Sequence, residues 1–214
     1  HLLIIETALA ASALTFGLQA FVTLFVILDP PGATPVFLAL VAGKTQRVMI
    51  RLAWQAASVS LFVIVIFALF GNYLLNYLQI SFPALQGAGG ILLLINALGL
   101  LTGSNDPNPK TRGDGSDRYI ALVPLGTPLL AGPGAIVSTM LFVKNAENWE
   151  QTTALAIAIL AVHLVIGLTL MFSTKIMALI KEAGVTLVAR IAGLLLAAIA
   201  VEMIVTSVKG FFNL

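Results

Sequence analysis

The segment FVILDPPGATPVF, residues 25–37, places an aspartate, two adjacent prolines, a glycine and a third proline inside an otherwise apolar stretch. Proline removes a backbone donor and clashes with the preceding turn, which costs about 3 kcal/mol in a helix interior. The sequence therefore predicts that an apolar helix breaks within this segment.

The composition of the chain is that of a membrane protein. Of its 214 residues, 59% are hydrophobic and 9% are charged, and the mean hydropathy is +1.05, far outside the averages of soluble domains. The apolar stretches do not alternate apolar with polar positions, which favours spanning helices over a β-barrel. We expect an all-α polytopic membrane protein with six transmembrane helices, at residues 16–42, 52–77, 84–101, 119–143, 152–171 and 185–208.

The start of the chain is apolar, apart from Glu6, as far as residue 15. This segment fits either an extension of the first helix or a helix lying in the membrane interface. His1 in place of Met suggests a processed or tag-derived end, so His1 is left out of the functional interpretation. The chain contains no cysteine, which excludes disulfides, thiol redox chemistry and thiolate metal sites.

Lysine and arginine are distributed unevenly between the loops. Alternate loops carry eight on one side of the membrane and two on the other. Because cytoplasmic loops are enriched in these residues, we expect a multi-pass protein of the cell (inner) membrane with both termini outside the cytoplasm. Basic residues at helix ends give no support to nucleic-acid binding. The eight are Lys44, Arg47, Arg51, Lys110, Arg112, Arg118, Lys175 and Lys181, and the two are Lys144 and Lys209.

Two short motifs recur at a nearly constant separation. The tripeptide PGA occurs at residues 31–33 and 133–135, which are 102 apart, and Gly90 in AGGILLL aligns with Gly193 in IAGLLLA, 103 apart. We interpret the offset as an internal repeat. The "GAGG" run around Gly90 lacks the lysine and hydroxyl of a phosphate loop and indicates close helix packing instead.

The repeat divides the chain into a first three-helix unit, residues 1–101, and a second, residues 119–214. The intervening residues 102–118 are rich in Gly, Pro, Asn and Asp and are predicted to form a cytoplasmic linker. Three is an odd number of spans, so the second unit enters the membrane from the opposite side. Inverted repeats with interrupted helices are typical of secondary transporters whose substrate site lies near the midplane.

Six of the nine prolines fall in the first and fourth predicted spans, so we expect helices 1 and 4 to be discontinuous. Freed backbone groups in a membrane must face the protein interior. The amides of a new half-helix suit a carboxylate, and the carbonyls of the preceding one suit an ammonium group. Thr34 before Pro35, and Gly132 before Pro133, are predicted N-caps followed by proline at the first helical position.

A ligand with both charges on neighbouring atoms fits such ends, and an amino acid is the smallest common one. The small residues around the two breaks favour a small neutral amino acid. The predicted substrate-binding residues are Asp29, Pro30, Pro31, Gly32, Ala33, Thr34, Leu130, Ala131, Gly132, Gly134, Ala135 and Asn96. No catalytic residue, cofactor or metal site is predicted.

Polar residues within the spans have competing interpretations. Asp29 either caps the half-helix that begins at Pro30 or binds the ammonium group or carries a proton. Glu202 is the second candidate for ion coupling, or else extends to the interface. His163 aligns with Ser60 in the repeat, and an interhelical hydrogen bond is favoured over a metal site. Arg190 is expected to reach the headgroups or to pair with a carboxylate such as that of Glu182.

The motifs DPPGATPVF, VPLGTPLLAGPGAI and GGILLL resemble those of the MarC family of bacterial and archaeal membrane proteins, and the likeness covers essentially the whole chain. The resemblance implies six spans, transport of small neutral amino acids such as glycine and alanine, and no enzymatic role. Pro31 fills a variable position of the first motif. The family's motif positions correspond to Asp29, Pro30, Gly32, Pro35, Phe37, Pro124, Pro128, Ala131, Gly132, Pro133 and Gly134.

The leading hypothesis is a secondary transporter of small neutral amino acids that works by alternating access. The chain shows no Walker motif, so an ion gradient is the expected drive, with a proton favoured over sodium. The alternatives are a channel, an exporter of another small solute, and an intramembrane enzyme. A channel of this kind usually carries an Asn-Pro-Ala pair or a carbonyl ring, and an enzyme needs a catalytic pair. The oligomeric state is left open.

Overall fold

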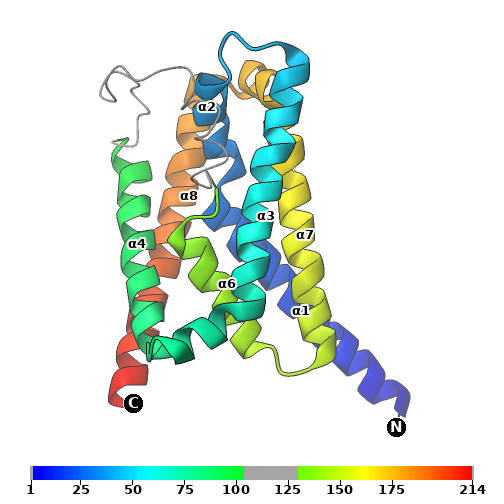
Figure 1. Cartoon of the computed structure of the whole chain (residues 1–214), viewed down its shortest axis with the longest axis vertical. Helices are drawn as coiled ribbons and strands as arrows, with labels where there is room; N and C mark the ends of the chain where they lie inside the picture. Colours follow the sequence, from blue (N-terminus) through cyan, green and yellow to red (C-terminus); the bar gives the residue numbers. More distant parts are fainter. Residues whose placement is uncertain (1, 104–129, 214) are drawn as a thin grey trace.

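The computed structural model describes residues 2–103 and 130–213, with side chains from residue 8 onward. Within these ranges the secondary structure is helical, and Figure 1 shows the helices side by side in one bundle with both termini at the same end. The helices are α1 (Leu2–Leu28), α2 (Pro30–Leu40), α3 (Gln46–Tyr77), α4 (Phe82–Thr102), α6 (Pro133–Asn145), α7 (Trp149–Met171) and α8 (Ser173–Phe212).

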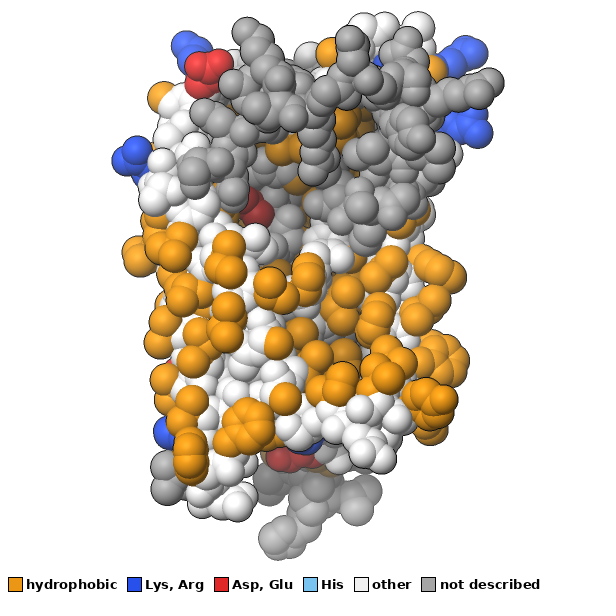
Figure 2. Space-filling model, turned by 60° about the vertical axis from the view of Figure 1, so that its left-hand side comes forward, with side chains coloured by type: hydrophobic (Ala, Val, Ile, Leu, Met, Phe, Trp, Pro, Cys, Tyr) orange, Lys and Arg blue, Asp and Glu red, His pale blue; other side chains and the backbone are white. Residues whose placement is uncertain are grey.

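The described helices have the length and surface of membrane spans. Five segments are long and apolar enough to cross a bilayer, and α1 and α2 together form the first, Ala8–Leu40. Figure 2 shows hydrophobic side chains in a band across the visible face, with most of the charged side chains toward its two ends. The prediction of an all-α membrane protein is confirmed. Much of the fourth predicted span lies outside the described residues, and α6 covers its end.

Capping residues explain where several helices begin and end. The hydroxyl of Ser81 accepts a hydrogen bond from the N–H of Ala84 at the start of α4 (3.3 Å). The side chain of Asn148 accepts one from the N–H of Gln151 at the start of α7 (2.8 Å). Gly103 ends α4 with a left-handed conformation, φ 71°, which glycine adopts without steric cost. These local signals set the lengths of the spans.

Two ends of the bundle differ from their predicted bounds. The first residues belong to α1, so they extend the first helix instead of forming a separate interfacial one. Helix α8 begins at Ser173, well before the predicted residue 185, and Lys181 interrupts it with φ 59° and ψ 173°. The predicted span is the part of α8 that follows this kink.

Helices α4 and α8 pack closely through a pair of glycines. A Cβ atom on Gly90 would lie 2.9 Å from the carbonyl oxygen of Ala200 in α8. A Cβ atom on Gly193 would lie 3.2 Å from the carbonyl oxygen of Ala97 in α4. The predicted close packing at both glycines is confirmed, because a side chain at either position would push the two backbones apart.

Helices α3 and α7 are joined by a buried hydrogen bond between Ser60 and His163. The Oγ atom of Ser60 lies 2.9 Å from Nε2 of His163, and Nδ1 lies 2.7 Å from the carbonyl oxygen of Ile159. A carbonyl only accepts, so Nδ1 carries the hydrogen, and Nε2 of the neutral ring accepts from the serine hydroxyl. The predicted interhelical hydrogen bond is confirmed.

Candidate functional site

The junction between α1 and α2 is a kink at a single residue. Asp29 has a left-handed backbone, φ 42° and ψ 64°, which aspartate tolerates better than most residues. Backbone hydrogen bonds continue across it: the N–H of Asp29 donates to Phe25 and the N–H of Ala33 donates to Asp29, both at 3.0 Å. The first span therefore bends at the predicted segment without opening a wide gap.

The kink frees backbone carbonyl groups. Pro30 and Pro31 carry no N–H, so the carbonyls of Val26 and Ile27 lack the donor that an uninterrupted helix would supply four residues later. These two oxygens end α1, where the helix dipole adds partial negative charge. They are suited to an ammonium group or a cation, as the sequence predicted.

The first turn of α2 has no amide available for an anion. A carboxylate oxygen of Asp29 accepts the N–H of Gly32 at 3.2 Å, and the N–H of Ala33 is already bonded. The two prolines contribute none. The predicted cap at Asp29 is therefore confirmed, but the prediction that these amides suit a carboxylate is wrong, because the protein's own carboxylate occupies that place. A Cβ atom on Gly32 would collide with the Asp29 side chain.

The prediction that Thr34 is an N-cap is also wrong. Thr34 lies inside α2, fully buried, and its hydroxyl donates to the carbonyl oxygen of Pro30 at 3.1 Å. Pro35 likewise lies within α2. Helix α2 begins five residues earlier than the Thr34–Pro35 pair suggested, because Asp29 is its N-cap and Pro30 its first residue.

The second motif begins α6 as predicted. Gly132 is the N-cap, with φ −70° and ψ 170°, and Pro133 is the first helical residue. The N–H groups of Ala135 and Ile136 both donate to the carbonyl oxygen of Gly132, at 3.1 and 3.2 Å. The motif's earlier prolines, Pro124 and Pro128, lie outside the described residues.

The structure brings the two motifs together in one buried cluster. Leu28 and Phe37, on either side of the first kink, belong to the same apolar cluster as Leu130, Ala131 and Ala135 of the second motif. Motifs about 100 residues apart in the chain thus line a shared interior.

Two predicted residues lie elsewhere. Asn96 is on an exposed face of α4, and Glu202 is on an exposed face of α8. Neither belongs to the cluster that joins the two motifs. Sequence periodicity alone does not separate these positions from buried ones, because the helices are apolar on all sides.

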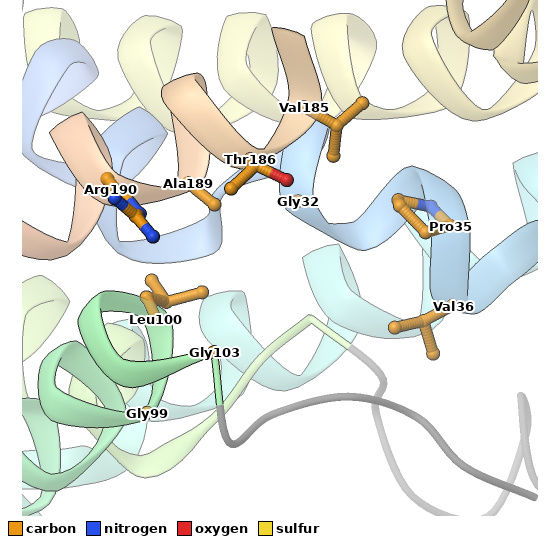
Figure 3. Close-up of a pocket in the computed structure, with 10 residues that line it drawn as sticks. All are labelled: Gly32, Pro35, Val36, Gly99, Leu100, Gly103, Val185, Thr186, Ala189 and Arg190. Atoms are coloured by element: carbon orange, nitrogen blue, oxygen red, sulfur yellow. The ribbon is translucent and has the colours of Figure 1, made fainter. Parts of the chain in front are cut away.

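A small cavity lies between α2, α4 and α8 (Figure 3). Its volume is about 190 Å³, and Arg190 is the charged residue among its described lining residues. Arg190 makes no ion pair with Glu182 or with another residue of the described ranges. The lining residues are Gly32, Pro35, Val36, Gly99, Leu100, Gly103, Val185, Thr186, Ala189 and Arg190.

Sequence reasoning did not assign Arg190 to a cavity. The three helices that surround it come from distant parts of the chain, so no local pattern indicates their meeting. The available signal was an arginine within a span, which in membrane proteins usually faces an interior or a cavity. Among the described residues, no three His, Asp or Glu side chains are grouped as metal ligands.

The apolar surface and the long apolar helices, with the kink in the first span, define a multi-pass integral membrane protein. The chain belongs to the MarC family, because the sequence model of that family, described as MarC family integral membrane protein, matches residues 14–212.

Curated relatives cover nearly the whole chain. The UPF0056 membrane protein MJ0972 of Methanocaldococcus jannaschii is 35% identical over 207 residues, which cover 94% of this chain and 90% of the relative. The UPF0056 membrane protein YvbG of Bacillus subtilis is 30% identical over 203 residues, with 92% and 96% covered. No solved structure matches the chain. The family assignment therefore applies to the whole fold.

Proposed function

We propose that this protein is a secondary transporter of small neutral amino acids such as glycine and alanine, and not an enzyme. In this proposal, which includes the resemblance to the MarC-family transporter SnatA, the substrate lies at the two helix interruptions. The names of the relatives specify a membrane location and no substrate, so the proposal rests on this chain's own geometry.

The observation that carries the proposal is the kink at Asp29. It places a partly buried carboxylate next to the freed carbonyls of Val26 and Ile27 in a membrane span. The carboxylate and the two carbonyls are three hydrogen-bond acceptors, and a primary ammonium group has three N–H donors to match them. Intramembrane carboxylates are costly and usually mark a substrate or ion pathway.

Small residues limit the size of the proposed substrate. Ala131 and Ala135 are buried in the cluster that joins the two motifs, and Ala33 packs against it. Gly134 is held so closely that a Cβ atom there would collide with the side chain of Leu93. Because these positions are closely packed, a substrate that enters between them in this proposal has to be small.

The proposal includes two inverted three-helix repeats, which contacts between their equivalent residues support. Ser60 and His163 are 103 residues apart and bond to each other, as residues near a two-fold axis do. Gly90 contacts Ala200, whereas Gly193 contacts Ala97. Each pair of equivalents is separated by 103, and such reciprocal contacts are the mark of two-fold symmetry.

A difference between the described parts of the two halves supports alternating access. Gly32, Pro35 and Val36 line the cavity beside α2. Their equivalents 102 residues later are Gly134, Val137 and Ser138, and all three are buried. One side of the proposed pathway is open and the equivalent side is closed.

The open side is the cytoplasmic one in this proposal. The cavity lies toward the ends of α2 and α4 and just after the kink of α8. Lys44 follows α2, and Lys175 and Lys181 lie in the first turns of α8; the positive-inside rule expects such residues at the cytoplasmic face. Both termini then lie outside the cytoplasm.

Calorimetric binding of glycine and alanine to the detergent-purified protein tests the proposal, with Asp29→Asn as the variant. Asparagine caps helices about as well as aspartate, so the fold is kept while the charge is removed. We expect binding in the wild type and weaker binding in the variant. With proton coupling at Asp29, the wild type also binds with a pH dependence that Asp29→Asn abolishes.

Glu202→Gln is the matched control for the coupling site. It removes the other candidate carboxylate, which lies on an exposed face of α8. If Glu202→Gln abolishes the pH dependence of binding and Asp29→Asn does not, the coupling site is Glu202. If the folded wild-type protein binds no small amino acid, the substrate proposal fails, and a channel or an exporter of another solute becomes the better interpretation.

A further inference from the structure

The cavity between α2, α4 and α8 contains a cation without an obvious partner. Arg190 has no hydrogen bond or ion pair with another residue of the described ranges. The carboxylate nearest along α8, Glu182, is two turns earlier and makes no ion pair with it. Arg190 is exposed and has no protein partner within the described ranges, and an arginine in a membrane span usually faces a cavity or a site for an anion.

The position of Arg190 differs from that of an arginine that only anchors a helix end. It is nine residues beyond the kink at Lys181, which is roughly 13 Å along the helix axis. Figure 3 shows its guanidinium beside Leu100, at the end of the cavity away from Pro35 and Val36. The equivalent residue of the first half, 103 positions earlier, is Gly87, so the packing of the repeat does not require a cation here.

The kinked span supplies no group for a carboxylate. The prolines and Asp29 leave no free amide in the first turn of α2. A zwitterion whose ammonium group lies at Asp29 therefore needs its carboxylate partner on another helix. The cavity brings α8 next to Gly32, the residue whose N–H bonds to Asp29.

We propose that Arg190 binds the carboxylate of the transported amino acid in this cavity. The inference rests on the proposed function. A guanidinium offers paired donors that match a carboxylate in geometry and charge. The volume of about 190 Å³ is below the 300–1,000 Å³ of sites for drug-sized ligands, which agrees with a small solute.

The test compares glycine with glycinamide, which keeps the ammonium group and lacks the carboxylate. Binding of both to the purified wild type is measured by calorimetry, and then to Arg190→Gln and Arg190→Lys. We expect Arg190→Gln to weaken glycine binding by roughly 10- to 100-fold, the usual range for a charged hydrogen bond. Glycinamide binding should stay unchanged. Arg190→Lys should weaken glycine binding less than Arg190→Gln does, because lysine keeps the positive charge.

Arg51→Gln is the matched control, because Arg51 is another arginine within a described helix and lines a different, open pocket with Trp54 and Gln55. It should bind glycine like the wild type. In the wild type, acetate should compete with glycine for binding. This measurement does not depend on whether a variant folds.

A lipid phosphate is the other anion that Arg190 could hold. In that case Arg190→Gln would bind glycine as tightly as the wild type, and acetate would not compete. Either result overturns the assignment of Arg190 while the transport proposal stands. A wild type that binds no glycine overturns the transport proposal and the role of Arg190 with it.

Discussion

At the scale of single residues, Asp29 shows how one side chain sets both a local structure and a candidate site. Its carboxylate caps α2 through the N–H of Gly32. The two prolines that follow it have no N–H, so two carbonyl groups at the end of α1 lack their helical donors. The cap could be predicted from Asp followed by Pro. The prediction at Thr34 was wrong because Thr34–Pro35, like Asp29–Pro30, is a capping residue followed by proline. The hydrogen bond from the N–H of Gly32 to the Asp29 carboxylate shows that α2 begins at the first of these two pairs.

Substitution at Ala135 tests the size limit of the site. Ala135 is buried in the cluster that joins the two motifs. We expect Ala135→Leu to abolish glycine binding and to cost about 1–3 kcal/mol of stability, since it overfills a packed interior. Ala33→Leu should act in the same direction. Ala39→Leu is the control, because Ala39 is exposed on α2; equal glycine binding by all three variants would disprove the size limit.

The hydrogen bond between Ser60 and His163 should couple the stability of α3 and α7. Ser60→Ala leaves Nε2 of a buried histidine without a donor, so we expect a loss of about 1–3 kcal/mol. His163→Leu removes the acceptor of that bond and should make the additional Ser60→Ala change nearly neutral. Unfolding of the four proteins in detergent gives the coupling energy by a double-mutant cycle. Additive losses would show that the two residues do not interact.

At the scale of helices, the bundle depends on small residues where backbones approach. The α4–α8 contact could be predicted from the glycine motifs. The lengths of the helices could be predicted only in part: the extra turns of α8, residues 173–184, contain Lys175, Lys181 and Glu182, which hydropathy assigns to a loop. Tertiary packing allows such a segment to stay helical.

Adding a methyl group at these glycines should have different effects at different sites. Gly90→Ala would place Cβ 2.9 Å from a carbonyl oxygen of α8, whereas Gly193→Ala would place it 3.2 Å from one of α4. We expect both to lower the unfolding temperature, Gly90→Ala more strongly. Gly132→Ala is the comparison without a clash, because nothing lies within 4 Å of its Cβ position, and it should lose only the preference of the N-cap of α6 for glycine over alanine. An unchanged unfolding temperature for Gly90→Ala would contradict the close approach of α4 and α8.

At the scale of the whole molecule, the all-helical membrane architecture and the family could be predicted from hydropathy and motifs. The cavity could not, since it requires α2, α4 and α8 to meet. Nor does the sequence indicate that Val36 lines this cavity whereas Ser138, its equivalent in the proposed repeat, is buried.

The absence of cysteine makes the two sides directly testable. Val36→Cys should react with a membrane-impermeant maleimide added from the cytoplasmic side. Ser138 is 3% exposed, and its hydroxyl has no hydrogen-bond partner among the described residues, as expected for a group that meets water in another state. Ser138→Cys should therefore react from the outside when the bundle reverses, and glycine should change the two reaction rates in opposite directions. A Ser138→Cys protein that stays unreactive from both sides would contradict alternating access.

The most direct measurement of the central claim is uptake of labelled glycine into vesicles that contain the purified protein. The account predicts saturable uptake that alanine competes for and that Ala135→Leu abolishes. Uptake no faster than in protein-free vesicles, with the reconstituted protein shown to be folded, would contradict the claim that this MarC-family protein transports small neutral amino acids.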